Sequence, residues 1–245
     1  TSWDTAGTFR ALGGEAELLG INLQGNQGRE GAFELGTQDA GTAVVRLGGQ
    51  GIKGIVGTGR VSLGNGTIVA TGDFSIEGTN AVTMMGCATG TVFDTAGHNI
   101  TVKTSLKEEE GAKIVKQGAG TLHLEAANEV SGTISVQGGT LQLSGTQAAR
   151  HYEIQEGATL SLTHGDSHVD VLSVSGGGVL LKNSAGDMNM GAAALHRLSL
   201  KGGGVSSITG AVSVAGQFSI GRETVNLLEG AVVTANRLTA GNEAD

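Results

Sequence analysis

The sequence predicts an all-β fold: a right-handed parallel β-helix, or β-solenoid, with about nineteen to twenty residues per coil. Its composition, a leucine repeat and a second aliphatic track support this prediction. Glycine accounts for 44 of the 245 residues and proline for none, whereas aromatic residues make up 3%. Few large rings are available to fill a wide core, but a solenoid needs only a narrow column of stacked aliphatic side chains.

A short segment with two leucines separated by one polar residue recurs after Gly120, Gly139 and Gly157. The spacing of its successive copies is constant, and a fourth copy follows at Leu180, one position later than that spacing predicts. Because side chains alternate across a strand, both leucines of each copy face inward and the residue between them, such as His123, faces outward. The predicted inward residues are Leu122, Leu124, Leu141, Leu143, Leu160 and Leu162.

A second aliphatic track runs between these leucine segments. Ile114, Ile134 and Ile154 are evenly spaced, and Leu172 follows slightly earlier than the same spacing predicts. Each coil therefore holds at least two short strands, which pair in parallel with those of the next coil at about 4.8 Å. A single coil cannot bury its own apolar face, so the coils must stack.

We expect residues 1–245 to form a single β-solenoid domain. Residues 1–95 form looser coils and a cap, whereas residues 96–245 form regular coils. Trp3 either packs over the open end of the solenoid or is a solvent-exposed remnant. Three consecutive alanines predict one short helix over Met188–Leu195.

Charge and cysteine content narrow the classes of function. The formal net charge of −8 argues against a nucleic-acid partner, which rewards clustered Lys and Arg. No apolar run reaches the ~20 residues of a membrane helix, so we expect no membrane insertion by this segment. The chain has one cysteine, Cys87, which we interpret as a small buried side chain. We expect Thr1 to begin a processed or excised segment, because no signal peptide opens the chain.

Residues 93–145 contain four sequence blocks in a fixed order. Phe93 begins an opening Phe-Asp-Thr block, and a Lys-x-Gly-x-Gly-Thr-Leu block, a turn centred on an asparagine and a Gly-Thr-Leu close follow. In order and spacing they resemble the autotransporter-associated β-strand repeat, also called the passenger-associated transport repeat. Family members have an aromatic residue near Val130 and a second glycine in this turn, so a tighter turn is expected here. The matching repeat positions are Lys116, Gly118, Gly120, Leu122, Leu124, Asn128, Gly132, Gly139, Leu141 and Leu143.

This resemblance implies a passenger β-helix of a Gram-negative protein that is exported by type V secretion. It also implies that the repeat aids transport or folding of the passenger. The expected location is therefore extracellular or on the cell surface. Other parts of a larger precursor, such as a C-terminal outer-membrane barrel, would then associate the chain with the outer membrane.

One polar segment offers candidate chemistry. Alternation along a strand would aim Asp166, His168 and Asp170 in one direction, and such a set suits a divalent metal. The favoured interpretation is a polar loop between coils, because no remote ligand pattern accompanies the three residues. Asp187 and the His196–Arg197 pair form a second polar group near the predicted helix. The sequence assigns no catalytic residue and no cofactor.

Three functions fit these observations. The first, which we favour, is a non-enzymatic structural or adhesive passenger module whose partner is a host or extracellular glycan or protein. The second is a glycan-active β-helix enzyme, which needs Asp, Glu, Lys or Arg side chains grouped on one exterior face. The third is a self-associating adhesin, in which a face rich in Ser, Thr and Asn packs against a second copy.

Overall fold

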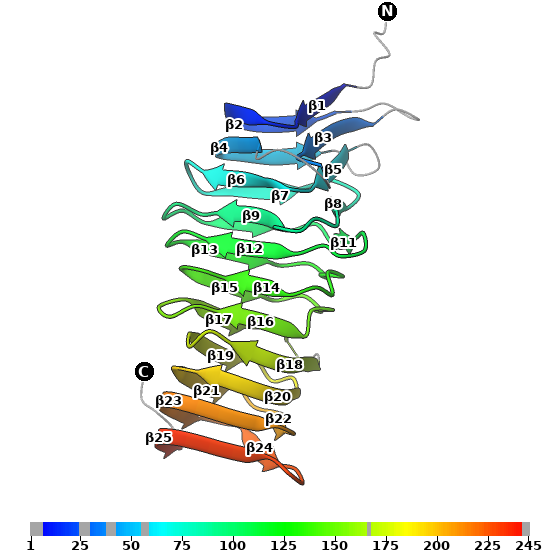
Figure 1. The fold of residues 1–245 in the computed structure, drawn as a ribbon. Coiled ribbons are helices and arrows are strands. Elements are labelled where there is room, and N and C mark those ends of the chain that lie inside the picture. Colours follow the sequence, from blue (N-terminus) through cyan, green and yellow to red (C-terminus); the bar gives the residue numbers. More distant parts are fainter. Residues whose placement is uncertain (1–6, 25–29, 38–42, 55–58, 166–167, 242–245) are drawn as a thin grey trace, which may run out of the picture.

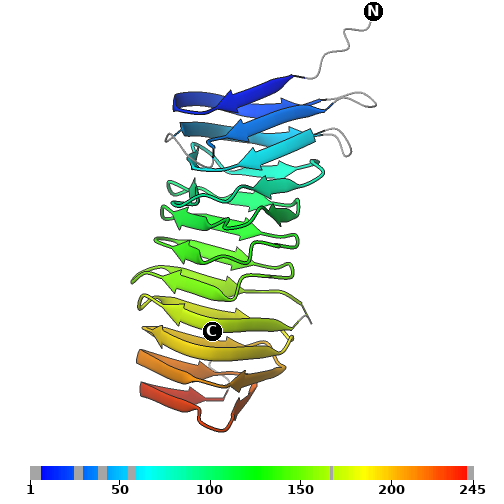
Figure 2. The same cartoon turned by 45° about the vertical axis from the view of Figure 1, so that its right-hand side comes forward.

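The computed structural model describes residues 7–24, 30–37, 43–54, 59–165 and 168–241. Within these ranges the chain consists of strands and loops, and the strands stack as an elongated β-solenoid (Figure 1). Equivalent strands lie about 21 residues apart along the chain, and the stack has about 10 turns. The turns follow one another from the N-terminal to the C-terminal end of the stack (Figure 2). The predicted all-β solenoid is confirmed, with a repeat slightly longer than the regular leucine segments indicate.

A short sheet of five strands covers one side of the N-terminal half. Its strands pair in parallel from each turn to the next. They are β1 (Thr8–Ala11), β3 (Gly31–Leu35), β5 (Gly59–Leu63), β8 (Val82–Met84) and β11 (Leu106–Glu108).

The remaining described strands belong to one sheet that runs along the whole stack. Successive turns of this sheet also pair in parallel, for example β13 with β15 and β15 with β17. The strands are β2 (Gly14–Leu23), β4 (Ala43–Gly54), β6 (Gly66–Ala70), β7 (Phe74–Glu77), β9 (Thr91–Asp94), β10 (Ile100–Val102), β12 (Ile114–Gln117), β13 (Thr121–Leu124), β14 (Ile134–Val136), β15 (Thr140–Leu143), β16 (His151–Ile154), β17 (Thr159–Leu162), β18 (Val169–Ser175), β19 (Val179–Asn183), β20 (Met188–Leu195), β21 (Arg197–Lys201), β22 (Val205–Ile208), β23 (Ala211–Ile220), β24 (Thr224–Leu227) and β25 (Val232–Ala240).

The core consists of columns of paired residues that run parallel to the stack. The leucine column begins at Phe74 and Ile100, passes through the four predicted leucine segments, and ends at Leu238. A neighbouring column runs without a break from Ile21 in the first turn to Ala240 in the last. Because apolar side chains of successive turns stack on one another, they bury an apolar face that one turn could not bury alone.

The helix predicted over Met188–Leu195 is wrong, because this segment is strand β20. It pairs in parallel with β18 on one side and with β22 and β23 on the other. Met188, Met190, Ala193 and Leu195 are buried while residues between them are exposed. The open edges of neighbouring strands thus override the helix propensity of the three alanines. No helix within the described ranges is long and apolar enough to cross a membrane.

The second aliphatic track has a different register from the predicted one. Ile114 pairs with Ile134, as their even spacing predicts. Ile134, however, pairs with Tyr152, and Ile154 pairs with Val136. The turn from Ile134 to Tyr152 is shorter than the one before it, because β16 presents two inward residues and Tyr152 is the first of them.

Leu172 is the residue of that track which faces solvent. It is 48% exposed, whereas Val174 is buried opposite Tyr152. Two consecutive residues of β18, Leu172 and Ser173, lie outside the core between buried Val171 and Val174. Because inward and outward side chains stop alternating here, the prediction that Leu172 faces inward, which was based on a fixed spacing, is wrong. Cys87 is buried, and Trp3 lies outside the described residues.

Candidate functional site

Lys116 occupies an inward position at the end of β12. Phe93 precedes it and Val136 follows it in one column of paired residues, and all three side chains are fully buried. A charged group in such a place must be satisfied by hydrogen bonds, because burial removes its hydration.

The Lys116 ammonium is surrounded by four oxygen acceptors at the corner of the solenoid. Its Nζ lies 2.7 Å from the carbonyl oxygen of Gln117, 2.8 Å from that of Gly118 and 2.9 Å from that of Gly138. The Thr95 hydroxyl oxygen lies at 3.0 Å. The lysine therefore links three successive turns, because Thr95 lies in the preceding turn and Gly138 in the following one.

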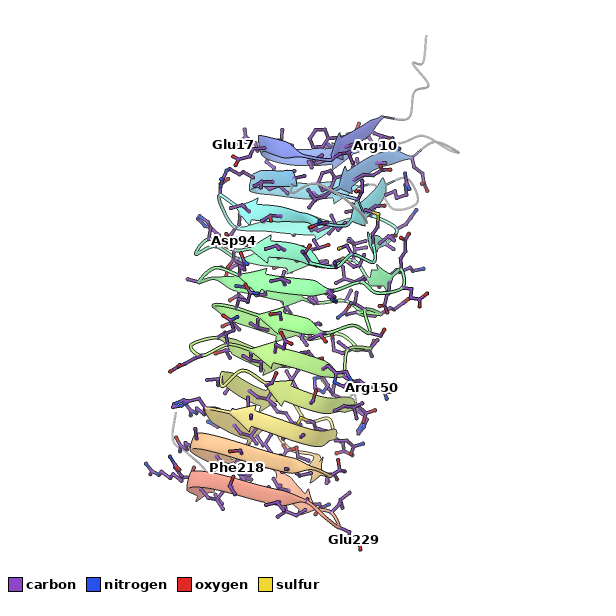
Figure 3. The ribbon with its side chains drawn as sticks, in the orientation of Figure 1. Arg10, Glu17, Asp94, Arg150, Phe218 and Glu229 are labelled. Atoms are coloured by element: carbon purple, nitrogen blue, oxygen red, sulfur yellow. The ribbon has the colours of Figure 1, made fainter. Side chains whose placement is uncertain are left out.

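Burial lowers the pKa of Lys116 to about 8, from an ordinary value of 10.5. The nearby Asp94 carboxylate acts in the opposite direction and favours the charged ammonium. Asp94 is labelled in Figure 3, at the end of β9. This lysine is thus held in a partly desolvated site whose acceptors favour the protonated form.

The glycines of the repeat permit the turns to approach closely at this corner. Gly118 has a φ of 77° and Gly139 a φ of 60°, and residues that carry a Cβ rarely adopt this backbone conformation. A Cβ on Gly120 would collide with the carbonyl oxygen of His98 in the preceding turn. The spacing of lysine and glycines therefore follows from corner geometry.

The repeat leucines lie in the columns that fill the interior. Each of them is buried, and each pairs with an inward residue of the adjacent turn. These residues are Leu122, Leu124, Leu141, Leu143, Leu160 and Leu162.

Asn128 organises the turn between β13 and β14. Its side chain is almost fully buried; Oδ1 accepts a hydrogen bond from the Val130 amide at 3.1 Å, and Nδ2 donates to Gln147 Oε1 at 3.0 Å. Gln147 belongs to the next turn of the solenoid, and its Nε2 donates a hydrogen bond to the Gly145 carbonyl. A Cβ on Gly132 would collide with the carbonyl oxygen of Ala112. Asn128 and Gly132 therefore also help successive turns of the solenoid to stack.

Lys182 is a second buried lysine, which the sequence reasoning missed. It follows Leu162 in the column of inward residues, and its Nζ lies 2.9 Å from both carboxylate oxygens of Glu223. Neither side chain of this ion pair is exposed to solvent. Nζ also donates to the carbonyls of Ser184 at 2.8 Å and Gly203 at 2.9 Å. Its place in register with Leu162 of the preceding turn was the available signal.

The predicted polar segment forms a cluster on the exterior. His168 Nε2 lies 3.0 Å from Asp170 Oδ1, and Asn189 Nδ2 lies 3.0 Å from the same oxygen. Arg150, which Figure 3 labels at the edge of the stack, lies 3.7 Å from Asp170 Oδ2. Hydrogen bonds from His168 and Asn189 lower the pKa of Asp170. Asp166 lies outside the described residues.

This exterior cluster brings together one carboxylate, one imidazole and one guanidinium. Among the residues that the structure describes, no three His, Cys, Asp or Glu side chains group closely enough to hold a metal ion. Asp187, from the second predicted polar group, accepts a hydrogen bond from the Val205 amide at 2.8 Å. His196 and Arg197 lie at the junction of β20 and β21.

Comparison with known families agrees with the geometry of the repeat. Residues 114–143 match the passenger-associated-transport-repeat, within the segment 93–145 that resembles this family. No curated protein and no solved structure gives a match to the chain. The matched repeat and the β-solenoid together fit a β-helix similar to the passenger of an autotransporter. Such a repeat implies secretion or surface display.

Proposed function

We propose that this β-solenoid, with its passenger-associated transport repeat, is a non-enzymatic structural and adhesive module of a Gram-negative type V secretion passenger. One observation carries the proposal: the repeat residues are buried or bind the backbone of adjacent turns. Lys116, Asn128 and the repeat leucines stabilise stacking and leave the exterior to contact a partner.

The outward face of β13, β15 and β17 is the surface we propose for adhesion. Thr121, Thr140 and Thr159 form one row across the three strands. A parallel series of hydrogen bonds joins His123 to Ser144 at 2.6 Å, and Ser144 to Thr163 at 2.9 Å. Hydroxyl, imidazole and amide groups in regular rows suit the polar surface of an extracellular glycan or protein.

Adhesion is tested with two variants of the purified chain that carry the same new side chain on different faces. Thr140→Arg places a bulky cation on the proposed face, and Glu153→Arg places it on the exposed side of β16. Binding to immobilised extracellular matrix and to an array of surface glycans is measured for both. We expect Thr140→Arg to lower binding at least tenfold while Glu153→Arg retains it. Equal binding by both variants would place adhesion elsewhere.

The role of the repeat in export is tested by fusing the chain between a signal peptide and an autotransporter barrel in a Gram-negative host. Lys116→Met removes the buried ammonium, whereas Lys113→Met alters an exposed lysine in the same turn. Surface-exposed, protease-resistant passenger is then quantified by antibody. The proposal expects a severalfold loss for Lys116→Met alone, and unchanged display would contradict a role of the repeat in passenger folding.

A glycan-active enzyme is the second candidate, because the exterior cluster joins Asp170, His168 and Arg150. Its test is turnover of a panel of acidic and neutral polysaccharides by the purified chain. Turnover that disappears in Asp170→Asn would overturn the non-enzymatic proposal. Glycan binding by the native chain without turnover would support the non-enzymatic proposal.

A further inference from the structure

The arginines of the last three described turns differ from the other described arginines in their charge partners. Among the described residues, Arg197, Arg222 and Arg237 have no carboxylate partner. Each arginine described before residue 160 has one, with a nitrogen-to-oxygen distance of 3.7 Å or less. These pairs are Arg10–Glu34, Arg46–Glu15, Arg60–Glu34 and Arg150–Asp170. The positive charge of the three later arginines is therefore not compensated within the described part of the chain.

Arg197 and Arg237 occupy equivalent positions on the outward side of one sheet face. Gln217 pairs with Arg237, and Arg197 lies alongside Gln217 because the residues that follow them, Leu198 and Phe218, pair with each other. Leu198 and Phe218 are buried, so by alternation the residues before them face outward. At about 4.8 Å per strand, the two arginines project from backbone positions about 10 Å apart. Both point sideways from the stack, so a further turn at either end would leave them on the surface.

The strands of this sheet face carry no carboxylate side chain. The face continues from β13 through β15, β17, β19 and β21 to β23 and β25, and none of these described strands contains Asp or Glu. The whole chain, by contrast, has 23 acidic residues and a formal net charge of −8. Unpaired guanidinium groups on a face without carboxylates give an acidic molecule a local positive potential.

The side chains around the two arginines leave the guanidinium groups available to a ligand. Ser199, Ser219 and Thr239 pair in the next outward column, and these short, uncharged side chains do not neutralise a cation. The Nε of Arg197 is buried and has no hydrogen-bond acceptor among the described residues. The Arg197 side chain can therefore turn this N–H toward an oxyanion without losing a protein hydrogen bond. A planar guanidinium group with unused donors suits the paired oxygens of a sulfate or a carboxylate.

We propose that the outward side of β21, β23 and β25 binds an acidic polysaccharide, one that carries sulfate or carboxylate groups, through Arg197 and Arg237. A single small anion cannot reach both arginines, whereas oxyanion groups that repeat along a sugar chain can each contact one guanidinium group. A long, stiff polyanion such as duplex DNA would also meet the carboxylates on the rest of the chain, which repel it. The site begins three turns beyond Thr140 and does not depend on the proposed adhesive function.

Binding of the purified chain to immobilised dextran sulfate and polygalacturonate, measured by biolayer interferometry, tests this site, and uncharged dextran is the negative control. A double variant with Arg197→Gln and Arg237→Gln should bind the acidic polysaccharides roughly tenfold more weakly, because two charge-assisted contacts are lost. The matched control combines Arg10→Gln with Arg60→Gln, which removes the same charge near the other end of the stack, where Figure 3 labels Arg10. This control should bind as tightly as the native chain.

Arg237→Gln alone changes an exposed side chain and should weaken binding severalfold without altering the thermal unfolding midpoint, so the test does not rest on the stability of the Arg197 variant. The affinity of the native chain should also fall as the salt concentration rises. Equal losses in the two double variants would assign binding to overall charge and overturn the proposal, as would a native chain that binds neither acidic polysaccharide. Duplex DNA bound as tightly as the polysaccharides would also overturn it, because the face would then recognise charge alone.

Discussion

Lys116 makes the stability of the solenoid depend on pH between about pH 8 and pH 10.5. Its pKa is about 8 in the folded chain and about 10.5 in the unfolded chain. Between these values the unfolded chain binds more protons, so the free energy of unfolding rises as the pH increases. Below pH 8 the lysine is protonated in both states and this contribution stays constant at its lowest level.

The magnitude follows from the difference of about 2.5 pH units between the two states. At 1.36 kcal/mol per unit, the free energy of unfolding should rise by about 3 kcal/mol between pH 8 and pH 10.5. Tyr152 acts in the opposite direction above pH 10, because burial raises its pKa and the unfolded phenol ionises first. The comparison must therefore be made between variants that share this tyrosine.

Guanidinium unfolding followed by circular dichroism at pH 7, 8, 9, 10 and 10.5 measures the effect. Lys116→Met lacks the titrating group, so the free energy of unfolding of the native chain minus that of the variant should rise by about 3 kcal/mol over this range. Lys113→Met, which alters an exposed lysine, should follow the native chain at every pH. Parallel pH profiles for the native chain and Lys116→Met would refute the assignment of Lys116 as a buried, titrating corner group.

Two further changes test the other contacts that hold successive turns together. Glu223→Gln leaves Lys182 buried without its counter-ion and should lower the free energy of unfolding by about 3–5 kcal/mol. Glu77→Gln is the control, because it removes a carboxylate from a partly exposed ion pair and should lower the free energy of unfolding by about 0–1 kcal/mol. Equal losses for the two variants would contradict the argument from burial. Gly120→Ala should lower the free energy of unfolding by about 1–3 kcal/mol, because the new Cβ collides with a backbone carbonyl oxygen. In Gly49→Ala the nearest atom to the new Cβ lies at an ordinary 3.5 Å, so this variant should be nearly as stable as the native chain. Similar denaturant midpoints for the two variants would refute the close approach of Gly120 to the preceding turn.

The leucine columns could be predicted from sequence because their spacing is a direct consequence of the fold. Leu122, Leu141 and Leu160 recur at one constant spacing because each turn has nearly the same contour there. The prediction was wrong where a turn changes length or alternation locally. Tyr152, and not Ile154, lies opposite Ile134, although both side chains are buried. Leu172 faces solvent because two consecutive residues of β18 lie outside the core.

The polar contacts of the candidate site were harder to predict, because spacing does not identify the acceptors of a buried charge. The family resemblance marked Lys116 as a repeat position, but its binding of the Gly138 carbonyl depends on how the following turn stacks. Glu223 lies 41 residues from Lys182, and nothing in the local sequence pairs them. The exterior contact between His168 and Asp170, by contrast, follows from alternation along a strand.

Lys116 and Lys182 solve one structural problem in two different columns. Each donates to the carbonyl two residues ahead and to a carbonyl in the next turn, Gly138 for the first lysine and Gly203 for the second. A leucine in either place would extend the apolar column but leave those corner carbonyls without this donor, at a cost of about 1–3 kcal/mol for each buried group. The lysine of the transport repeat is therefore best explained by the backbone it satisfies, and a second lysine can occur wherever a turn needs the same donors. By this argument Lys182 extends the stacking device of the repeat beyond residues 114–143, the segment that matches the family.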